Sequence, residues 1–230
     1  MSQTGTLYVV GTPIGNLEDI TLRALNILRE VSLIAAEDTR RTRQLLSAYE
    51  IKASLTSYHE HNKRAKLPRI LQALREGHVA LVCNAGMPGI NDPGYDLIQA
   101  ALEHDMDVVP VPGPSAITTA LSVSGITVEQ FVHLGFLPRK KGARKKLLES
   151  VANEPRAIVA FETPHRIISA LGDVSEVLGE RRIAVCRELT KLHEEVFRGT
   201  VSEAMEHFVN PKGEFALVIE GKRREKTKGD

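Results

Sequence analysis

Short apolar runs alternate with helix-sized segments through the first half of this chain, and this alternation restricts the fold more than any other feature. The runs predict strands at residues 6–10, 33–36, 54–57, 79–83 and 108–111. Strands separated by helices are joined by right-handed crossovers, so they form a mostly parallel sheet. Residues 1–112 are therefore expected to form one α/β domain.

One helix between these strands has a clear apolar pattern. Leu67, Ile70, Leu71 and Leu74 recur with the 3.6-residue period of a helix that buries one face. Pro68 lacks the N–H that a helix interior needs, so the pattern predicts that Pro68 lies in the first turn. A glycine at position 77 is well placed to end the helix.

A proline-rich connector divides the chain. Residues 110–114 read Pro-Val-Pro-Gly-Pro, which favours a stiff, extended segment, and we expect a domain boundary after Pro112. Beyond it, the strand-like runs 183–187, 195–199 and 215–220 have one helix-sized segment among them. This spacing predicts antiparallel pairs, and so a mixed sheet, in an α/β domain of residues 113–221. Residues 222–230 are charged and unpatterned, and we expect them to be disordered.

Composition excludes several classes of protein. Hydrophobic residues make up 42% of the 230, enough for a sizeable core. Aromatic residues are only 4% and Trp is absent, which disfavours aromatic platforms for single-stranded nucleic acid. A net charge of +1 means that any nucleic-acid contact must come from local basic clusters. The two cysteines, Cys83 and Cys186, lack metal-ligand spacing, so no metal site is expected. The start is unlike a signal peptide, and no apolar run reaches membrane-spanning length, so a cytoplasmic protein is expected.

The segment Ala80–Gly94 carries the clearest indication of a ligand site. A buried strand runs into a loop rich in Gly and Pro and then into a helix, and ligands bind beyond the carboxyl ends of such strands. The loops after the first and fifth strands are also rich in Gly and Pro, with small or apolar side chains. Neither a Walker loop nor a dinucleotide fingerprint is present, and there is no GxSxG elbow. The pattern favours a small ligand that is bound mainly by backbone groups.

The motifs around these loops resemble those of the tetrapyrrole methylase family, the class III S-adenosylmethionine (SAM) methyltransferases. The resemblance covers about Thr6 to Gly221, and its motifs are TPIGNLEDIT, AAEDTR, INDPGY, VPGPSA, GFLPRK, the His165–Arg166 pair, RELTK and KGE. It implies two α/β domains with SAM in the cleft between them, and a homodimer. Within the family, the motifs are most similar to the branch that methylates a cytidine 2′-hydroxyl in small-subunit ribosomal RNA. The alternatives are a small-molecule tetrapyrrole methylase and a non-catalytic SAM- or RNA-binding module.

The resemblance also implies which residues bind SAM. From the first domain these are Pro13, Ala85, Gly86, Met87, Ile90, Ser115 and Ala116, and from the second Phe161, Glu162, Cys186 and Phe215. The chain departs from the family pattern SDAGTPLI at four positions, Cys83, Asn84, Met87 and Gly89. Asn84 replaces an acidic residue and Met87 a threonine, and we expect SAM binding to be retained.

A general base would help to remove the 2′-hydroxyl proton. The candidates in or beside the matched motifs are Glu37, Asp38, Asp92, Glu162, His165, Glu188 and Lys191. We favour Glu37, Asp38 and Glu188, because each lies at the end of a predicted strand.

RNA contact is expected from local positive charge. Six cations fall within eight residues at 139–146, beside a predicted strand end, and this density favours phosphate binding. The predicted RNA-binding residues are Arg40, Arg139, Lys140, Lys141, Arg144, Lys145, His165 and Arg166. Such contacts position RNA but do not select the base.

Overall fold

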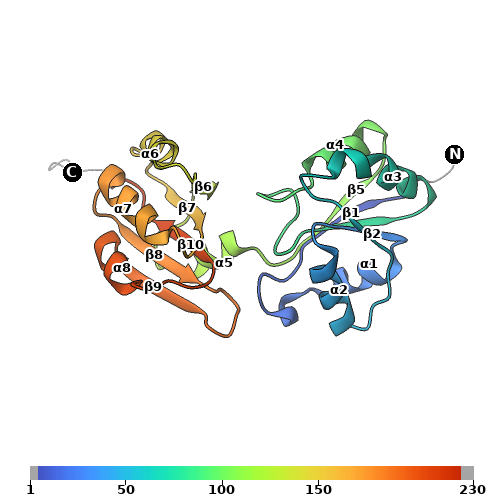
Figure 1. Ribbon diagram of the computed structural model, residues 1–230, viewed down its shortest axis with the longest axis horizontal. Helices are drawn as coiled ribbons and strands as arrows, with labels where there is room; N and C mark the ends of the chain where they lie inside the picture. Colours follow the sequence, from blue (N-terminus) through green and yellow to red (C-terminus); the bar gives the residue numbers. More distant parts are fainter. Residues whose placement is uncertain (1–4, 224–230) are drawn as a thin grey trace. The chain divides into compact units, whose positions relative to one another are not determined.

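The computed structural model describes residues 5–223, which divide into two compact units between Ser115 and Ala116 (Figure 1). This division falls at the end of the proline-rich connector, close to the boundary expected after Pro112. The tail expected to be disordered lies, from residue 224 on, outside the described residues. Within the described range no helix is long and apolar enough to cross a membrane.

The first unit is built on a parallel five-stranded sheet with the strand order β3-β2-β4-β1-β5. This confirms the mostly parallel sheet predicted from the alternating pattern. The elements in chain order are β1 (Leu7–Val10), the 3₁₀ turn η1 (Leu17–Asp19), α1 (Leu22–Glu30), β2 (Leu33–Ala36), α2 (Thr39–Ala48), β3 (Leu55–Ser57), α3 (Lys63–Glu76), β4 (Val79–Val82), α4 (Tyr95–Glu103) and β5 (Val108–Val111).

Helices cover both faces of this sheet because alternate strand residues point to opposite sides. Ile34 and Val82 face the apolar side of α1 and α2, in a core that includes Leu28. Their strand neighbours face α3 and α4 instead, in a core with Leu74 and Leu97. A strand that is covered on both faces needs apolar residues throughout. The fully buried strands β2 and β4 accordingly consist only of Leu, Ile, Val and Ala.

Helix α3 begins earlier than the sequence pattern predicted. It starts at Lys63, so Pro68 lies inside the helix and not in its first turn, and that prediction was wrong. A tight turn at His59 initiates the helix, because the Asn62 and Lys63 amides donate to the His59 carbonyl oxygen. The predicted C-terminal boundary is confirmed: the Gly77 amide donates to the Ala73 carbonyl oxygen.

The second unit is built on a mixed five-stranded sheet with the order β6-β7-β10-β8-β9. Only β6 and β7 are parallel, and the other three pairings are antiparallel, which confirms the predicted mixed sheet. The elements are α5 (Ala116–Val123), β6 (Phe131–Phe136), α6 (Lys141–Ser150), β7 (Ala157–Glu162), α7 (Ile167–Leu178), β8 (Arg182–Arg187), β9 (Glu195–Thr200), α8 (Val201–His207) and β10 (Phe215–Ile219).

Helices α6, α7 and α8 pack side by side on one face of this sheet (Figure 1). Their shared core joins Leu148 of α6, Leu171 of α7 and Val201 of α8 to alternate residues of the strands. Helix α5 contacts β10 and is tied to β9, where the Arg198 guanidinium donates to the Val123 carbonyl oxygen at 2.9 Å.

Candidate functional site

The strand order of the first unit brings four loops to one edge of its sheet. Strands β2, β4, β1 and β5 are consecutive neighbours and parallel, so their carboxyl ends lie side by side. The chain leaves β1 toward β2 and leaves β4 toward β5, in opposite directions along the sheet. Such a switch point, here between β1 and β4, is where open α/β sheets bind ligands.

The loops after β1 and β4 are bonded directly to each other. Thr12 and Gly86 exchange both backbone hydrogen bonds, with N–O distances of 2.9 and 3.0 Å. The buried Thr12 hydroxyl also donates to the Cys83 carbonyl oxygen at 3.1 Å. Gly86 has a φ of 78°, a conformation that a side chain disfavours. These bonds hold the two glycine-rich loops in one fixed arrangement.

The loops after β1 and β5 also touch through their backbones. A Cβ placed on Gly113 would lie 2.8 Å from the Gly11 Cα, and one on Gly11 would lie 2.7 Å from the Gly113 Cα. The Met87 sulfur lies equally close to that position on Gly11. Three loops distant in sequence therefore converge on one small area of backbone, as expected for a ligand bound mainly through main-chain groups.

Two carboxylates influence each other at this edge of the sheet: Glu37, directly after β2, and Asp92, in the loop between β4 and α4. The Glu37 Oε2 accepts a hydrogen bond from the Asn84 amide at 3.0 Å. Burial and the nearby negative charge of Glu37 raise the pKa of Asp92 to about 6. The Asn84 side-chain oxygen is buried without a hydrogen-bond partner. Burial, with the charge of Asp92, raises the pKa of the Cys83 thiol to about 12, so this cysteine stays protonated.

Two of the predicted bases are held as anions by partners. The Arg40 guanidinium lowers the pKa of Asp38 to about 2, and Asp38 also caps α2 by accepting from the Arg40 amide. Although burial acts in the opposite direction, the Glu214 amide and the Lys191 ammonium lower the pKa of Glu188. A carboxylate with a low pKa is a weak proton acceptor, so Asp92 is better suited to this role than Asp38 or Glu188.

The structure distributes the predicted SAM-binding residues over both units. In the first unit, Ala85 and Ile90 are exposed, while Pro13 and Gly86 are buried. Met87 and Ser115 are intermediate, as is Ala116 at the start of α5.

In the second unit, the predicted SAM-binding residues face opposite sides of the sheet. Phe215 points into the helix-covered core and packs against Phe208, with ring centroids 5.4 Å apart, so its side chain is structural. Phe161 and Cys186 lie on the other side, where burial raises the pKa of the Cys186 thiol to about 11. Glu162 is 1% exposed, and its Oε2 has no hydrogen-bond partner.

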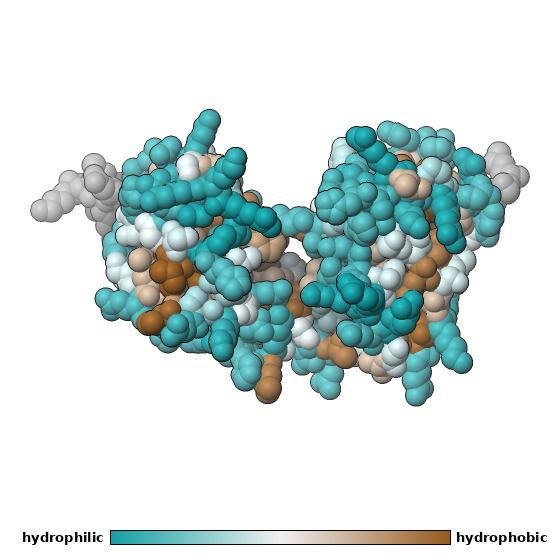
Figure 2. Space-filling view, in the orientation of Figure 1, coloured by the Kyte–Doolittle hydropathy of each residue, from teal (hydrophilic) through white to brown (hydrophobic). Residues whose placement is uncertain are grey.

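The predicted RNA-binding cations separate into exposed and buried groups. Arg139, Lys140 and Lys141 are exposed and are called the basic segment below. Figure 2 shows hydrophilic side chains over the part of the second unit that holds α6. Arg144 is only 4% exposed because its guanidinium pairs with Asp173. Because helix α6 turns Arg144 inward, the prediction that it contacts RNA was wrong.

The remaining predicted RNA contacts differ in availability. His165 is exposed, and the Arg40 side chain is 85% exposed beside Asp38. Lys145 pairs with Glu176 on the next helix. Arg166 is turned inward, where its Nη2 lies 2.6 Å from the Glu162 Oε1.

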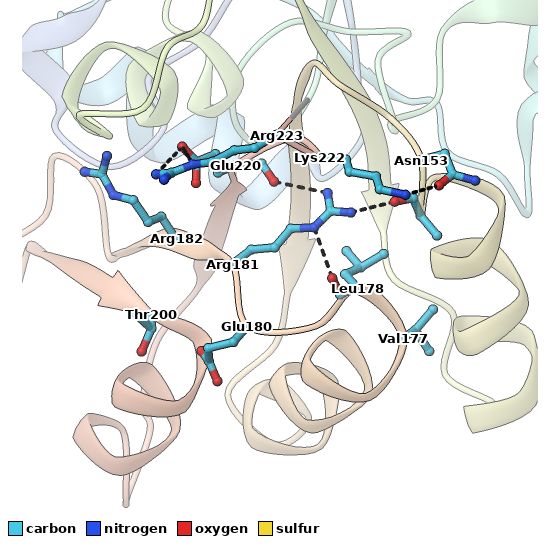
Figure 3. Close-up of a pocket in the computed structure, with 12 residues that line it drawn as sticks. Asn153, Val177, Leu178, Glu180, Arg181, Arg182, Thr200, Glu220, Lys222 and Arg223 are labelled. Carbon is cyan, nitrogen blue, oxygen red and sulfur yellow. Dashed lines mark hydrogen bonds and ion pairs between the residues drawn. The ribbon is translucent and has the colours of Figure 1, made fainter. Parts of the chain in front are cut away.

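A pocket of about 490 Å³ lies within the second unit (Figure 3). Arg181 crosses it and donates to three carbonyl oxygens, those of Leu178, Glu220 and Ala152. Lys222 donates to Asn153. Because each nitrogen of the central guanidinium donates to a different backbone segment, we interpret this pocket as a structural junction and not as the candidate site.

Sequence reasoning did not separate the functional cations from the structural ones. The inward roles of Arg144 and Arg166 depend on two carboxylates: Asp173, which the packing of α6 against α7 brings to Arg144, and Glu162, which ends β7 four residues before Arg166. Helix α7 carried a readable indication, since its apolar residues recur at helical spacing. Among the residues that the structure describes, no group of three or more His, Cys, Asp or Glu could hold a metal ion.

Comparison with known proteins gives a consistent family. Residues 6–205 match the family described as Tetrapyrrole (Corrin/Porphyrin) Methylases. The chain is 52% identical over 221 residues to a Thermotoga maritima protein named Ribosomal RNA small subunit methyltransferase I, covering 95% of this chain and 99% of that one. A Bacillus subtilis protein of the same name is 47% identical over 230 residues, with 98% and 78% covered.

Solved structures show the same fold. The crystal structure of the methyltransferase CobJ aligns with 96% of this chain and 97% of its own, at a TM-score of 0.69 and 16% identity. An identity this low supports the fold but carries no information on the substrate.

Proposed function

Because this chain belongs to the tetrapyrrole methylase family, we propose that it transfers the methyl group of SAM to the 2′-hydroxyl of a cytidine in small-subunit (16S) ribosomal RNA. The observation that carries the proposal is its 52% identity, over nearly the whole of both chains, to a relative named for that RNA. The motif resemblance adds the sugar position and the base. The resemblance also implies a homodimer. We propose that it acts in the cytoplasm, on the assembled small subunit.

The loops of the first unit fit SAM as a ligand. Their tight backbone contacts at Gly11 and Gly113 leave main-chain groups and small side chains to hold it. The unpartnered Asn84 oxygen is an acceptor suited to an N–H or O–H of the ligand. We propose Pro13, Ala85, Gly86, Met87, Ile90, Ser115 and Ala116 as its contacts, with Phe161 and Cys186 of the second unit.

SAM supplies a methyl carbon that its sulfonium makes electrophilic. In the proposed reaction the ribose O2′ forms a bond to this carbon, the C–S bond breaks, and its electron pair leaves with sulfur as S-adenosylhomocysteine. The hydroxyl proton must go to a base. Asp92 is the proposed acceptor, because its pKa of about 6 leaves it ionised at neutral pH yet more basic than Asp38 or Glu188. Glu37 supports it by holding the Asn84 amide and keeping that pKa high.

The exposed cations of the second unit supply the proposed RNA contacts. The basic segment is a local concentration of positive charge in a chain whose net charge is only +1, and His165 is an exposed side chain of the same unit. Phosphate contacts of this kind fix the position of the RNA without reading its sequence. Selection of one cytidine then depends on the folded shape of the RNA.

Labelled SAM tests the proposal directly. The protein is incubated with small ribosomal subunits from a strain that lacks the modification or, in parallel, with a porphyrinoid precursor. Label in a 2′-O-methylcytidine of the RNA is the expected result. Label in the porphyrinoid would identify a small-molecule methylase, and measurable SAM binding with no transfer to either would identify a non-catalytic module. Either outcome overturns the proposal.

A further inference from the structure

Two of the arginines expected to contact RNA are directed inward, toward the backbone that precedes the basic segment. On α6, the Arg144 guanidinium pairs with Asp173 of α7, with Nε–Oδ2 and Nη2–Oδ2 distances of 2.7 and 2.6 Å. Both residues are buried, with exposed fractions of 4% for Arg144 and 3% for Asp173. The remaining arm, Nη1, donates to the Pro138 carbonyl oxygen at 3.3 Å.

Arg166 makes the corresponding contact one residue earlier. Its Nη2 lies 2.6 Å from Oε1 of the buried Glu162, and its Nε donates to the Thr163 hydroxyl at 3.2 Å. Its Nη1 donates to the Leu137 carbonyl oxygen at 3.0 Å. The Leu137 amide is also bonded, to the Phe161 carbonyl oxygen at 3.2 Å. Each guanidinium is therefore oriented by a carboxylate, and its Nη1 donates to a backbone carbonyl oxygen in the two residues before Arg139.

We propose that Arg144 and Arg166 are positioning residues that hold the Leu137–Pro138 backbone, so that Arg139, Lys140 and Lys141 are already arranged to meet RNA phosphates. This inference rests on the proposed function. Two adjacent carbonyl groups accept hydrogen bonds from arginines of two separate ion pairs. The Arg144–Asp173 pair is buried between α6 and α7, and the Arg166–Glu162 pair, in which Arg166 is partly exposed, lies at the end of β7. The planar guanidinium suits this task, because it can bond a carboxylate and a carbonyl oxygen at the same time.

The physical advantage is pre-organisation. A flexible loop must lose backbone and side-chain freedom when it binds, and that loss weakens association. A loop already fixed at two consecutive carbonyls loses less. Buried and partly buried ion pairs contribute little net stability compared with apolar packing, so the two pairs are better explained by a positional role than by stability alone.

Arg144→Lys is the sharpest test variant. Lysine keeps the positive charge beside Asp173, but a single ammonium lacks the fork that reaches both Asp173 and Pro138. Arg156→Lys serves as the matched control, since Arg156 pairs with Glu154 at 2.6 Å in the same unit without touching the basic segment. Arg166→Lys is a second, independent variant for the case in which Arg144→Lys does not fold.

The first measurement is native-state hydrogen exchange in the full chain without RNA. Two backbone amides report on the loop: that of Leu137, which donates to the Phe161 carbonyl oxygen, and that of residue 144, which donates to the Lys140 carbonyl oxygen. In Arg144→Lys both amides should exchange roughly tenfold faster, since local opening becomes easier. The amide of Leu217, in the centre of β10, is the internal reference and should not change. Equal protection at Leu137 in a folded variant would overturn the inference.

The second measurement separates positioning from folding. We expect the KM for small ribosomal subunits to rise roughly tenfold in Arg144→Lys, while kcat and SAM affinity stay within about twofold. Faster exchange with an unchanged KM would show that the arginines hold the loop for a reason other than RNA. Failure of the wild-type chain to methylate RNA would instead remove the proposed function, while the exchange experiment would still test the hold on Leu137.

Discussion

At the scale of single residues, the main finding is that chemical type did not reveal role. Asp38, Asp92 and Glu188 are all carboxylates near strand ends or in their loops, yet only Asp92 has a raised pKa. The difference in pKa arises from burial and partners. Asp38 is paired with Arg40, two residues further along the chain, whereas Asp92 is desolvated and faces the charge of Glu37, which follows β2. The sequence could place these residues near the same sheet edge but could not show which one is desolvated.

The pH dependence of methyl transfer follows from this assignment. Asp92 must be ionised to accept a proton, so the rate should rise through pH 6 and level off above it. Glu37→Gln removes the charge that raises the pKa of Asp92, and should therefore move the midpoint to lower pH while keeping an acceptor for the Asn84 amide. Asp38→Asn, which still can cap α2, is the control and should leave the midpoint in place. A Glu37→Gln profile that does not move would count against Asp92.

Removal of the base itself should separate activity from stability. Asp92→Asn should lower kcat by roughly 10²–10⁴-fold, the usual contribution of general acid–base catalysis. The folded pKa of Asp92 lies above its unfolded value, so ionisation opposes folding, and this loss of stability grows from about pH 4 to pH 6. With allowance for partial exposure, the variant should be more stable than the wild type by about 1–2 kcal/mol at pH 8. Denaturant unfolding should show the two converging near pH 4.

At the scale of elements, the sequence predicted existence better than extent. The strands of the first unit and the end of α3 at Gly77 follow from periodicity and capping, but its start does not, because a turn at His59 sets it. Helix α6 was not predicted from the sequence. Its buried residues are Leu148 and Arg144, and an arginine does not contribute to an apolar pattern.

The contact between the loops after β1 and β5 can be tested sterically. Gly113→Ala would place a Cβ 2.8 Å from the Gly11 Cα, closer than real contacts allow, so the two backbones must separate. We expect a loss of SAM affinity of at least about tenfold and a destabilisation of about 1–3 kcal/mol. Gly142→Ala is the matched control, because nothing lies within 4 Å of its Cβ and alanine favours the helix there. Calorimetric titration with SAM measures the affinity and denaturant unfolding measures the stability. Equal SAM affinities would contradict the proposed SAM site.

At the scale of the whole molecule, a nearly neutral chain concentrates positive charge where the proposed substrate needs it. The sequence located this charge at residues 139–146, but only the structure separates its outward and inward members. The type of sheet in each unit, parallel in the first and mixed in the second, was likewise expected from the alternating and non-alternating halves of the chain. Partners such as Arg144 and Asp173, or Asn84 and Glu37, could not be predicted, because these residues are far apart in sequence.

Salt dependence measures the outward members. Changing Arg139, Lys140 and Lys141 to Ala should weaken RNA binding and reduce the slope of log K against log salt by up to about 2–3, since each phosphate contact contributes roughly 0.7–0.9. SAM affinity should be unchanged. Arg156→Ala, a change of one exposed cation elsewhere in the unit, should leave the slope nearly intact. A slope that the triple change does not alter would exclude the basic segment from the RNA interface.

The strand order of the first unit has a consequence for how the chain folds. Strand β1 is synthesised first, yet both of its neighbours, β4 and β5, come from Val79–Val82 and Val108–Val111. Its pairing is therefore entirely non-local, and contacts of this kind form slowly because long loops must close first. Until residues 108–113 have emerged from the ribosome, β1 lacks one of its two neighbouring strands and Gly11 lacks its contact with Gly113. Maturation of the ligand loops is thus a late event in the folding of this unit, set by the arrival of β5.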